Sequence, residues 1–272
     1  MIGRRLRKFN RNTTEGAFVS IGYQVDQGVA TLTINRPEKK NALTGAMYEA
    51  LVAHLKQAAD DKSVRAVIIT GAGNAFTAGN DLKDFGDPRF IQPDSPVLGF
   101  MQGLANFEKP VIAAVNGIAV GIGVTMLLHC DLVYVADNAS FSTPFTALGL
   151  VPEFASTLLF PMIAGRVRAT EALLLGKPFL AAEAVVMGFA NAVLPAAELL
   201  THARTVARKF AALPPGSVRE SKRLLKQALG PAVQEAILRE ASQFGPRLAG
   251  GEAREAIAAI IEKRAPDFSK FS

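Results

Sequence analysis

The sequence predicts an α/β fold in which a mostly parallel sheet is followed by a helical C-terminal region. In the first half of the chain, short β-prone runs alternate with helix-length segments, a pattern typical of βα units. After Pro152 the periodicity becomes helical. The 272 residues are 49% hydrophobic and 20% charged. A chain of this size and composition can bury its own core, which excludes disordered chains and small disulfide-stapled scaffolds.

The first elements predicted are a hairpin and an amphipathic helix. Two β-prone runs, at 18–25 and 29–34, flank the turn sequence Asp26-Gln27-Gly28, and this arrangement predicts antiparallel pairing. Thr44 can cap a helix that ends near residue 60, because apolar residues recur there at the spacing of one helical face.

Further buried strands are predicted at 66–70, 111–115 and 132–136. A long loop rich in Gly, Asp and Pro joins the first two, and a helix-length segment at 122–129 precedes the third. Strands and helices in this order favour a mostly parallel sheet.

Helical periodicity dominates the remainder of the chain. It covers 166–175, 181–187, 196–212, 218–229, 232–248 and 252–264. The break at Pro214-Pro215-Gly216 predicts a boundary between an α/β core over residues 17–212 and a helical region over residues 213–272. Such a short helical piece cannot easily bury its own apolar face, so we expect it to pack on the core or on a neighbouring subunit.

The net charge of +6 is concentrated in an N-terminal basic tail over residues 1–16. Removing the five cationic residues that precede the first acidic one leaves a net charge of +1. A nucleic-acid partner is therefore not expected for the folded body. The tail is interpreted as a disordered or added extension, with an Arg-rich organellar targeting segment as the alternative.

A cytoplasmic protein without a membrane partner is expected. Cys130 is the single cysteine, and no hydrophobic signal segment opens the chain, which favours a reducing compartment. The longest apolar stretch, 111–130, is interrupted by Asn116, His129 and glycines, so it does not read as a membrane span. The chain ends Lys270-Phe271-Ser272 rather than in a peroxisomal S-K-L signal.

Several common types of site are excluded by their missing residues. Gly71-Ala72-Gly73 follows a strand, but Phe76 occupies the third glycine position of a dinucleotide-binding motif. No phosphate-binding loop or nucleophile elbow occurs. The three histidines lie far apart in the sequence, so no metal site is predicted.

Two glycine-containing turns, at 76–82 and 116–123, are predicted to join a strand to a helix. Helix N-termini carry unpaired N–H groups, and glycine lets the backbone approach a ligand closely. Two such turns facing one point would form an oxyanion hole from main-chain groups. The alternative is a pair of ordinary strand-to-helix turns, with Asp81 as a helix cap.

The segments FTAGNDL, AAVNGIAVGIGVTMLLHCDLVYV and FSTPFTALGLVPE resemble successive signatures of the crotonase, or enoyl-CoA hydratase/isomerase, superfamily. The likeness extends over residues 18–271 and is greatest to the peroxisomal-type Δ3,Δ2-enoyl-CoA isomerases. It implies a crotonase-like spiral of ββα units with a C-terminal helical trimerisation region. It also implies an acyl-CoA partner, a homotrimer or dimer of trimers, and no cofactor beyond the thioester substrate.

The same resemblance implies the catalytic residues. The thioester oxygen would lie between the backbone amides of Asn80 and Ile122. Hydratases of the superfamily use two glutamates, whose positions here hold Thr125 and Phe145, and neither side chain can act as an acid or base. Glu153 occupies the position of the isomerase carboxylate, and apolar neighbours would raise its pKa. The alternative is a solvated glutamate at the start of a helix.

Substrate contacts are also carried over by position. Lys83, and with less support Lys40, would face the CoA phosphates. Ala42, Leu43 and Ala78 would contact adenine and pantetheine, whereas Thr125, Phe145 and Leu150 would wall the acyl pocket, although an ordinary core would look the same. The remaining candidates are Asp81, Leu82, Gly121 and Gly123.

The expected activity is that of an enoyl-CoA delta isomerase, which moves a double bond of a fatty acyl-CoA from position 3 to position 2. Two alternatives remain open at this point. One is an enoyl-CoA hydratase or another crotonase-type reaction, and the other is a non-catalytic homologue that binds acyl-CoA or RNA.

Overall fold

The computed structural model describes residues 20–86, 92 and 94–271, so the predicted tail at 1–16 lies outside the described residues. Within them, a six-stranded sheet has the order β1-β2-β3-β5-β7-β10. The predicted hairpin is confirmed, because β1 (Ile21–Asp26) pairs antiparallel with β2 (Val29–Ile34). The other strands are parallel: β3 (Ala66–Gly71), β5 (Val111–Val115), β7 (Leu132–Ala136) and β10 (Ala192–Leu194).

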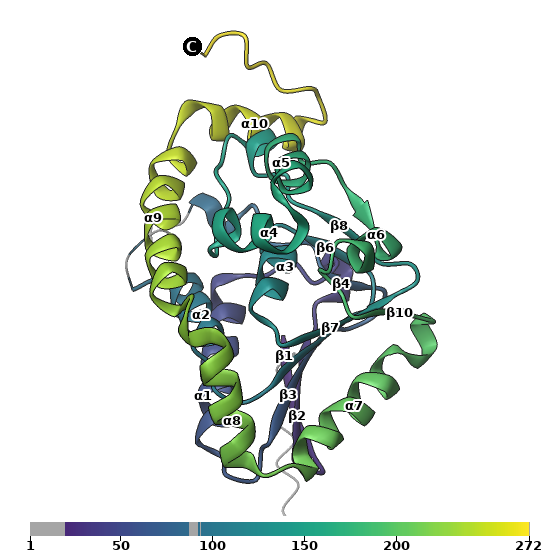
Figure 1. Ribbon diagram of the computed structural model, residues 1–272. Helices are drawn as coiled ribbons and strands as arrows, with labels where there is room; N and C mark the ends of the chain where they lie inside the picture. The colour runs from purple at the N-terminus through teal and green to yellow at the C-terminus, as the bar shows by residue number, and fades with distance from the viewer. Residues whose placement is uncertain (1–19, 87–91, 93, 272) are drawn as a thin grey trace, which may run out of the picture.

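A smaller sheet lies beside the first and has the order β4-β6-β8-β9 in the described part of the chain. Its strands are β4 (Ala75–Thr77), β6 (Ile118–Val120), β8 (Ser140–Ser142) and β9 (Phe179–Leu180). Along the chain β3 is followed by β4, β5 by β6 and β7 by β8, so each turn of the fold adds one strand to each sheet. This is the spiral of ββα units that was expected (Figure 1).

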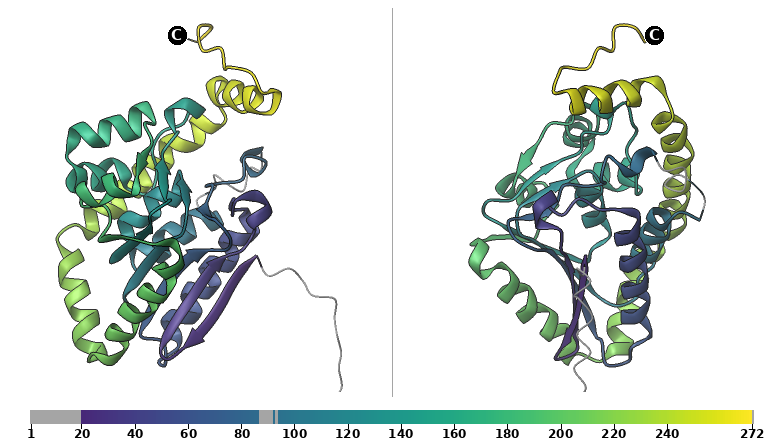
Figure 2. Two further views of the ribbon diagram at one scale, coloured as in Figure 1. Left: turned by 90° about the vertical axis from the view of Figure 1, so that its right-hand side faces the viewer. Right: turned by 180° about the vertical axis from the view of Figure 1, so that it is seen from behind.

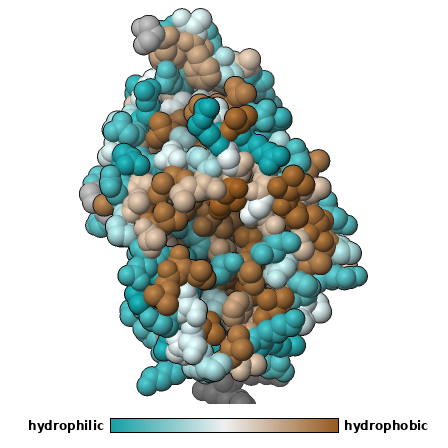
Figure 3. All heavy atoms as spheres, viewed as in Figure 1, coloured by the Kyte–Doolittle hydropathy of each residue, from teal (hydrophilic) through white to brown (hydrophobic). Residues whose placement is uncertain are grey.

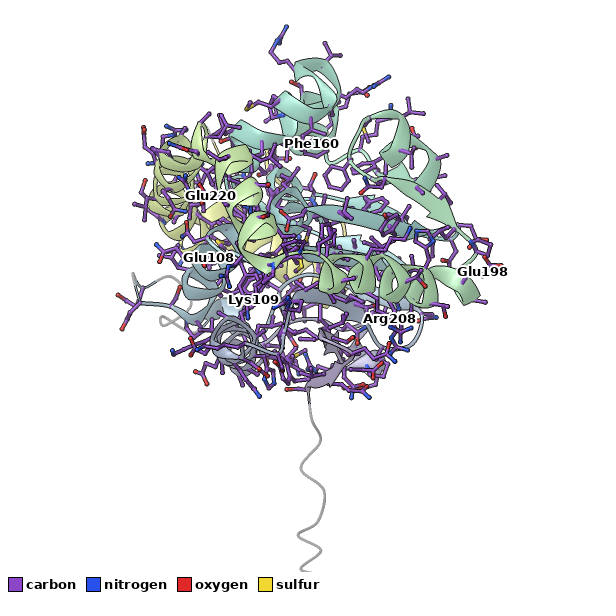
Figure 4. The ribbon with its side chains drawn as sticks, turned by 60° about the horizontal axis from the view of Figure 1, so that its bottom comes forward. Glu108, Lys109, Phe160, Glu198, Arg208 and Glu220 are labelled. Atoms are coloured by element: carbon purple, nitrogen blue, oxygen red, sulfur yellow. The ribbon has the colours of Figure 1, made fainter. Side chains whose placement is uncertain are left out.

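Helices cover both faces of the six-stranded sheet. On one face α1 (Gly45–Asp60) packs against α2 (Pro96–Ala105), and the Thr44 hydroxyl accepts the Met47 amide as the predicted cap. On the other face lies α7 (Ala196–Ala212), which Figure 4 shows crossing the sheet, with Glu198 near its start. Side chains alternate along β3, so that Ile69 faces the α1 side and Ile68 the α7 side.

Most of the remaining helices lie where helical periodicity was predicted. These remaining helices are α3 (Ile122–Thr125), α4 (Ser156–Ala164), α5 (Arg166–Leu175), α6 (Ala181–Val186), α8 (Pro215–Gln227), α9 (Gly230–Leu248) and α10 (Gly251–Glu262). The prediction of one helix at 122–129 was wrong, because α3 gives way to a tighter 3₁₀ turn at Met126–His129. Two helices escaped prediction: α4 contains Pro161, and α2 lies in the segment taken as loop.

The C-terminal helices pack on the α/β core. On α8 the buried Lys222 ammonium donates to the Asp131 carboxylate at 2.6 Å and to the Lys109 carbonyl oxygen at 2.7 Å. The long helix α9 runs along one side of the molecule, and α10 lies at the end opposite the β1–β2 hairpin (Figures 1 and 2). Gly149 meets the backbone of α10, because a Cβ there would lie 2.6 Å from the Ala253 nitrogen.

Candidate active site

The turn after β4 leaves the Asn80 amide unused by the sheet. Leu43 pairs with Asn80 in a parallel bridge, in which the Leu43 amide donates to the Gly79 carbonyl and the Asp81 amide donates to the Leu43 carbonyl, both at 2.8 Å. These bonds engage the groups on either side of the Asn80 N–H. Among the described residues, no hydrogen-bond acceptor is found for that N–H.

The turn after β6 leaves a second free amide. Gly121 takes a positive φ of 55° and donates its N–H to the Ser142 carbonyl at 2.9 Å. Ile122 then begins α3, and within the described chain its N–H has no acceptor, as expected for the first residue of a helix. The two turns are in contact, because a Cβ at Gly79 would lie 2.8 Å from the Val120 carbonyl oxygen.

Asp81 anchors its own turn instead of capping a helix. No α-helix follows it in the described residues up to 86; the chain forms only a 3₁₀ turn at Asp84–Gly86, so the expected helix start after Gly79 was wrong. The Asp81 carboxylate accepts a hydrogen bond from the Arg36 guanidinium at 2.6 Å and one from the Lys83 amide at 3.1 Å. Burial raises the pKa of Asp81, but these hydrogen bonds outweigh it and leave the pKa lowered.

A cavity of about 460 Å³ opens beside the two turns. Six of the predicted site residues line it: Ala78, Asn80, Leu82, Gly121, Phe145 and Leu150. Helix α10 closes the opposite wall with Ala256, Ala259 and Ile260. The wall is predominantly apolar, so a ligand carbonyl that reached the free amides would be shielded from water.

The other predicted residues do not line this cavity. Ile122 follows the lining residue Gly121 but is itself buried at the start of α3. Lys40 and Lys83 are exposed on the surface, Ala42 is half-buried, and Leu43 is fully buried in the core. Gly123 lies in the buried α3 turn. Thr125 is also fully buried, and its hydroxyl finds no hydrogen-bond partner among the described residues.

Glu153 lines an adjacent cavity of about 260 Å³ between α2 and α9. Val97 and Met101 from α2 and Ile237 from α9 form much of its apolar wall. Phe244 lines both this cavity and the one beside Asn80. Glu153 therefore does not line the same cavity as Asn80, but the neighbouring one.

The Glu153 carboxyl group is buried, and its surroundings raise its pKa. Only 5% of the residue is exposed, and Oε1 has no hydrogen-bond partner in the described structure. Burial, followed by the nearby Glu240 carboxylate, raises the pKa of Glu153 to about 8. A carboxylate with so high a pKa is a stronger base than an ordinary glutamate.

Tyr48 holds the turn at Asn80 and interacts electrostatically with Glu153. This tyrosine on α1 is fully buried, and its hydroxyl donates to the Asn80 side-chain oxygen. Burial raises the pKa of Tyr48, and the charges of Glu153 and Asp84 raise it further. Sequence analysis missed Tyr48, for which the only signal was its place on the buried face of α1.

The backbone after Glu153 is held in an unusual conformation. Phe154 and Ala155 both have positive φ, 63° and 55°, which costs a non-glycine residue about 1–3 kcal/mol. His129 stacks on the Phe154 ring at 3.9 Å between centroids, and its Nε2 lies 2.8 Å from the Phe154 carbonyl oxygen. Burial lowers the pKa of His129 to about 3, so the neutral ring donates this hydrogen bond.

The described residues contain neither a metal-binding cluster nor a membrane-spanning helix. Across residues 20–86, 92 and 94–271, no group of three or more His, Cys, Asp or Glu side chains is arranged to hold a metal ion. In the same residues, no helix has both the length and the apolar character needed to cross a membrane.

Comparison with known proteins places these features in context. Residues 24–270 match the family described as enoyl-CoA hydratase/isomerase. The chain is 40% identical over 206 residues to enoyl-CoA delta isomerase 2 of Rattus norvegicus, in a match covering 74% of this chain and 52% of that protein. The chain thus spans about half the length of this relative.

Hydratases are similar to the chain as well. The probable enoyl-CoA hydratase echA8 of Mycobacterium bovis is 34% identical over 245 residues, covering 90% of this chain and 95% of that protein. Among solved structures, an enoyl-CoA hydratase/isomerase from Pseudoalteromonas atlantica superposes with a TM-score of 0.88 at 42% identity, covering 92% of this chain and 99% of that one.

Proposed function

The chain belongs to the enoyl-CoA hydratase/isomerase family, and within that family we propose that it is a Δ3,Δ2-enoyl-CoA isomerase acting on fatty acyl-CoA. One observation carries the proposal. Among the described residues that line the two adjacent cavities, Glu153 is the only acidic side chain. A double-bond shift needs one group that takes and returns a proton, whereas addition of water needs a second group to position and activate the water.

The proposed reaction begins with the thioester carbonyl between the Asn80 and Ile122 amides. These N–H groups stabilise the negative charge that develops on the carbonyl oxygen. Glu153 removes a proton from C2, and the electron pair delocalises into a dienolate. Glu153 then delivers the proton to C4, which leaves the double bond between C2 and C3 and regenerates the carboxylate.

Other groups near the site do not supply the second acid or base. Thr125 is fully buried, and Phe145, which lines the cavity, has no titratable group. Glu240 is a buried carboxylate, but it lines neither cavity, and Thr157 donates two hydrogen bonds to its Oε1. These observations favour the isomerase over the hydratase.

The proposal also covers the coenzyme, the oligomeric state and the cellular location of the protein. Its shuttle uses one carboxylate and two amides, so the CoA thioester is the only coenzyme it needs. A homotrimer or pair of trimers is supported by apolar side chains exposed on α4, α5 and α6, where Figure 3 shows apolar surface: Met162, Val167, Leu175 and Val186. The lone Cys130 is in keeping with a reducing, cytoplasmic location.

The test is Glu153→Gln, assayed with 3-enoyl-CoA and with 2-enoyl-CoA. We expect turnover of 3-enoyl-CoA to fall roughly 10²–10⁴-fold, because the amide cannot accept the proton, while acyl-CoA binding is retained. The exposed Glu198 on α7 provides the control Glu198→Gln, which should behave like wild type. Near wild-type turnover by Glu153→Gln, or efficient water addition to 2-enoyl-CoA by the wild type, contradicts the proposal.

A further inference from the structure

Helix α4 begins at Ser156, three residues after Glu153, and its N-cap makes no side-chain hydrogen bond. Its N-cap is Ala155, whose side chain cannot accept a hydrogen bond. The Ser156 amide donates to the Glu153 carbonyl at 3.2 Å and the Leu158 amide to the Ala155 carbonyl at 3.0 Å, which leaves the Thr157 amide of the first turn without a local acceptor. Helix N-termini normally satisfy these amides with a Ser, Thr, Asp or Asn side chain. The start of α4 therefore needs an acceptor from elsewhere in the chain.

Glu240 on α9 supplies that acceptor. Its Oε1 accepts the Thr157 amide at 3.0 Å and also the Thr157 hydroxyl. The two residues are 83 positions apart, so the contact exists only when α9 is docked on the core. A negative charge at this place is also favoured by the positive end of the α4 dipole.

We propose that Glu240 is a positioning residue for Glu153: it caps α4 from the C-terminal helix α9 and so fixes the left-handed turn at Phe154 and Ala155 that aims the Glu153 carboxyl group. The naming of Glu153 as the base rests on the proposed function; the capping itself does not. The Glu153 side chain is therefore held in its orientation only when α9 is packed against the core.

The two carboxyl groups also influence each other directly. Each is only 5% exposed, and each has one oxygen without a hydrogen-bond partner in the described residues, Oε1 of Glu153 and Oε2 of Glu240. Burial raises the pKa of Glu240, and the Thr157 and Ala155 hydrogen bonds oppose this effect. The presence of Glu240 in turn raises the pKa of Glu153.

Other titratable groups face this pair from the elements around it. Tyr48 approaches from α1 and interacts with Glu153, and Arg239 on α9 stabilises the charged form of Glu240. His129, from the 3₁₀ turn, stacks on Phe154 and is neutral above a pH of about 3. Glu240 is therefore the group whose removal should change the titration of Glu153 most.

The experiment compares Glu240→Ala and Glu240→Gln with the wild type. In Glu240→Ala we expect kcat to fall about tenfold or more while KM changes less than about threefold, because the base is misplaced and the binding surface is kept. Glu240→Gln should recover most of kcat, since an amide oxygen can still accept from Thr157. The exposed Glu220 on α8, which among the described residues pairs with Arg223 of the same helix, gives the control Glu220→Ala.

A pH profile separates positioning from a general loss of folding. With the like charge removed, the acidic limb of kcat/KM should move to lower pH by at least about half a unit in both Glu240 variants. A wild-type kcat in Glu240→Ala overturns the proposal. So does a loss of kcat that Glu240→Gln fails to rescue, or an acidic limb that stays in place. If Glu240→Ala does not fold, the position of the acidic limb of kcat/KM in Glu240→Gln alone decides whether the proposal holds.

Amide hydrogen exchange tests the capping without any turnover. Exchange at the Thr157 amide should be at least about tenfold faster in Glu240→Ala than in wild type or Glu220→Ala. Unchanged protection overturns the proposal. If the wild type instead fails to isomerise 3-enoyl-CoA, the proposed function fails while the exchange result still decides whether Glu240 holds the turn.

Discussion

The Tyr48 hydroxyl on α1 donates a hydrogen bond to the side-chain oxygen of Asn80, the residue whose backbone amide remains free beside the larger cavity. A fully buried tyrosine thus holds the first of the two proposed oxyanion donors. The Glu153 charge also raises the pKa of Tyr48, so the same tyrosine interacts electrostatically with the proposed base.

Replacement of this hydroxyl should weaken catalysis more than folding. In Tyr48→Phe the Asn80 side chain loses its donor, and we expect kcat to fall about three- to tenfold with KM little changed, in line with roughly 1 kcal/mol for a lost hydrogen bond. Tyr23 gives a matched control, because its buried hydroxyl has no hydrogen-bond partner in the described chain. Tyr23→Phe should keep wild-type kcat; equal effects of the two variants would remove Tyr48 from the site.

The contact between the two turns makes Gly79 less replaceable than Gly121. Gly79 has a φ of +84°, and an added Cβ would meet the Val120 carbonyl oxygen at 2.8 Å. At Gly121 the φ is +55°, but the nearest atom to a Cβ is Phe145 Cε1 at 4.0 Å. We expect Gly121→Ala to lower the free energy of unfolding by about 1 kcal/mol and Gly79→Ala by about 2–4 kcal/mol. Urea denaturation measures both, and the reverse order would contradict the packing argument.

The raised pKa of Glu153 predicts an acidic limb near neutral pH. With a pKa of about 8, about a tenth of the Glu153 side chains are ionised at pH 7. The base must be ionised to act, so kcat/KM for 3-enoyl-CoA should rise nearly tenfold per pH unit below pH 7 and level off above pH 8. A profile that is flat from pH 6 to pH 9 would exclude Glu153 as the titrating base.

The same pKa makes Glu153 a cost to stability at high pH. The unfolded carboxyl group ionises near 4.5, whereas the folded one holds its proton until about 8, so stability falls as pH rises between these values. Glu153→Gln removes this loss. Its melting temperature should exceed that of the wild type by several degrees at pH 8.5 and approach it at pH 4.5, which differential scanning calorimetry can measure.

His129 has the opposite pH dependence. Its pKa is lowered from 6.5 to about 3 in the folded protein, so the unfolded state binds a proton first, and stability falls as pH decreases through this window. In His129→Gln the side-chain amide can still donate to the Phe154 carbonyl but does not titrate. Urea unfolding between pH 6.5 and pH 4 should then show a shallower loss of stability than in wild type. Parallel slopes would contradict the assignment of a neutral ring.

Sequence patterns were sufficient for five of the six strands of the large sheet and for most helices, but they missed the short strand β10. The runs at 111–115 and 132–136 are strands with the predicted bounds, and Thr44 caps its helix, because burial and capping leave clear local signals. Three-residue strands such as Ala75–Thr77 are too short to show an alternating pattern. Pro161 concealed α4, although the helix accommodates it.

The site was only partly predictable for a related reason. The glycine-containing turns alone predicted only two possible anion-binding sites, and Asn80, Ile122 and Glu153 were proposed from the resemblance of their segments to signatures of the superfamily. Tyr48 and Glu240 act through partners 32 and 83 residues away. Their position on a helix face records burial, but nothing local in the sequence specifies the partner across the fold.

Phe244 on α9 lines both the cavity beside Asn80 and the cavity beside Glu153. An unsaturated acyl chain whose carbonyl group lies in the cavity beside Asn80 would have to pass the Phe244 side chain to enter the cavity beside Glu153. Truncating the Phe244 side chain, as in Phe244→Ala, would join the two cavities into one. The enzyme would then accept acyl chains of a wider range of bulk and curvature. This aromatic side chain on α9 would therefore limit the choice of acyl-CoA substrate.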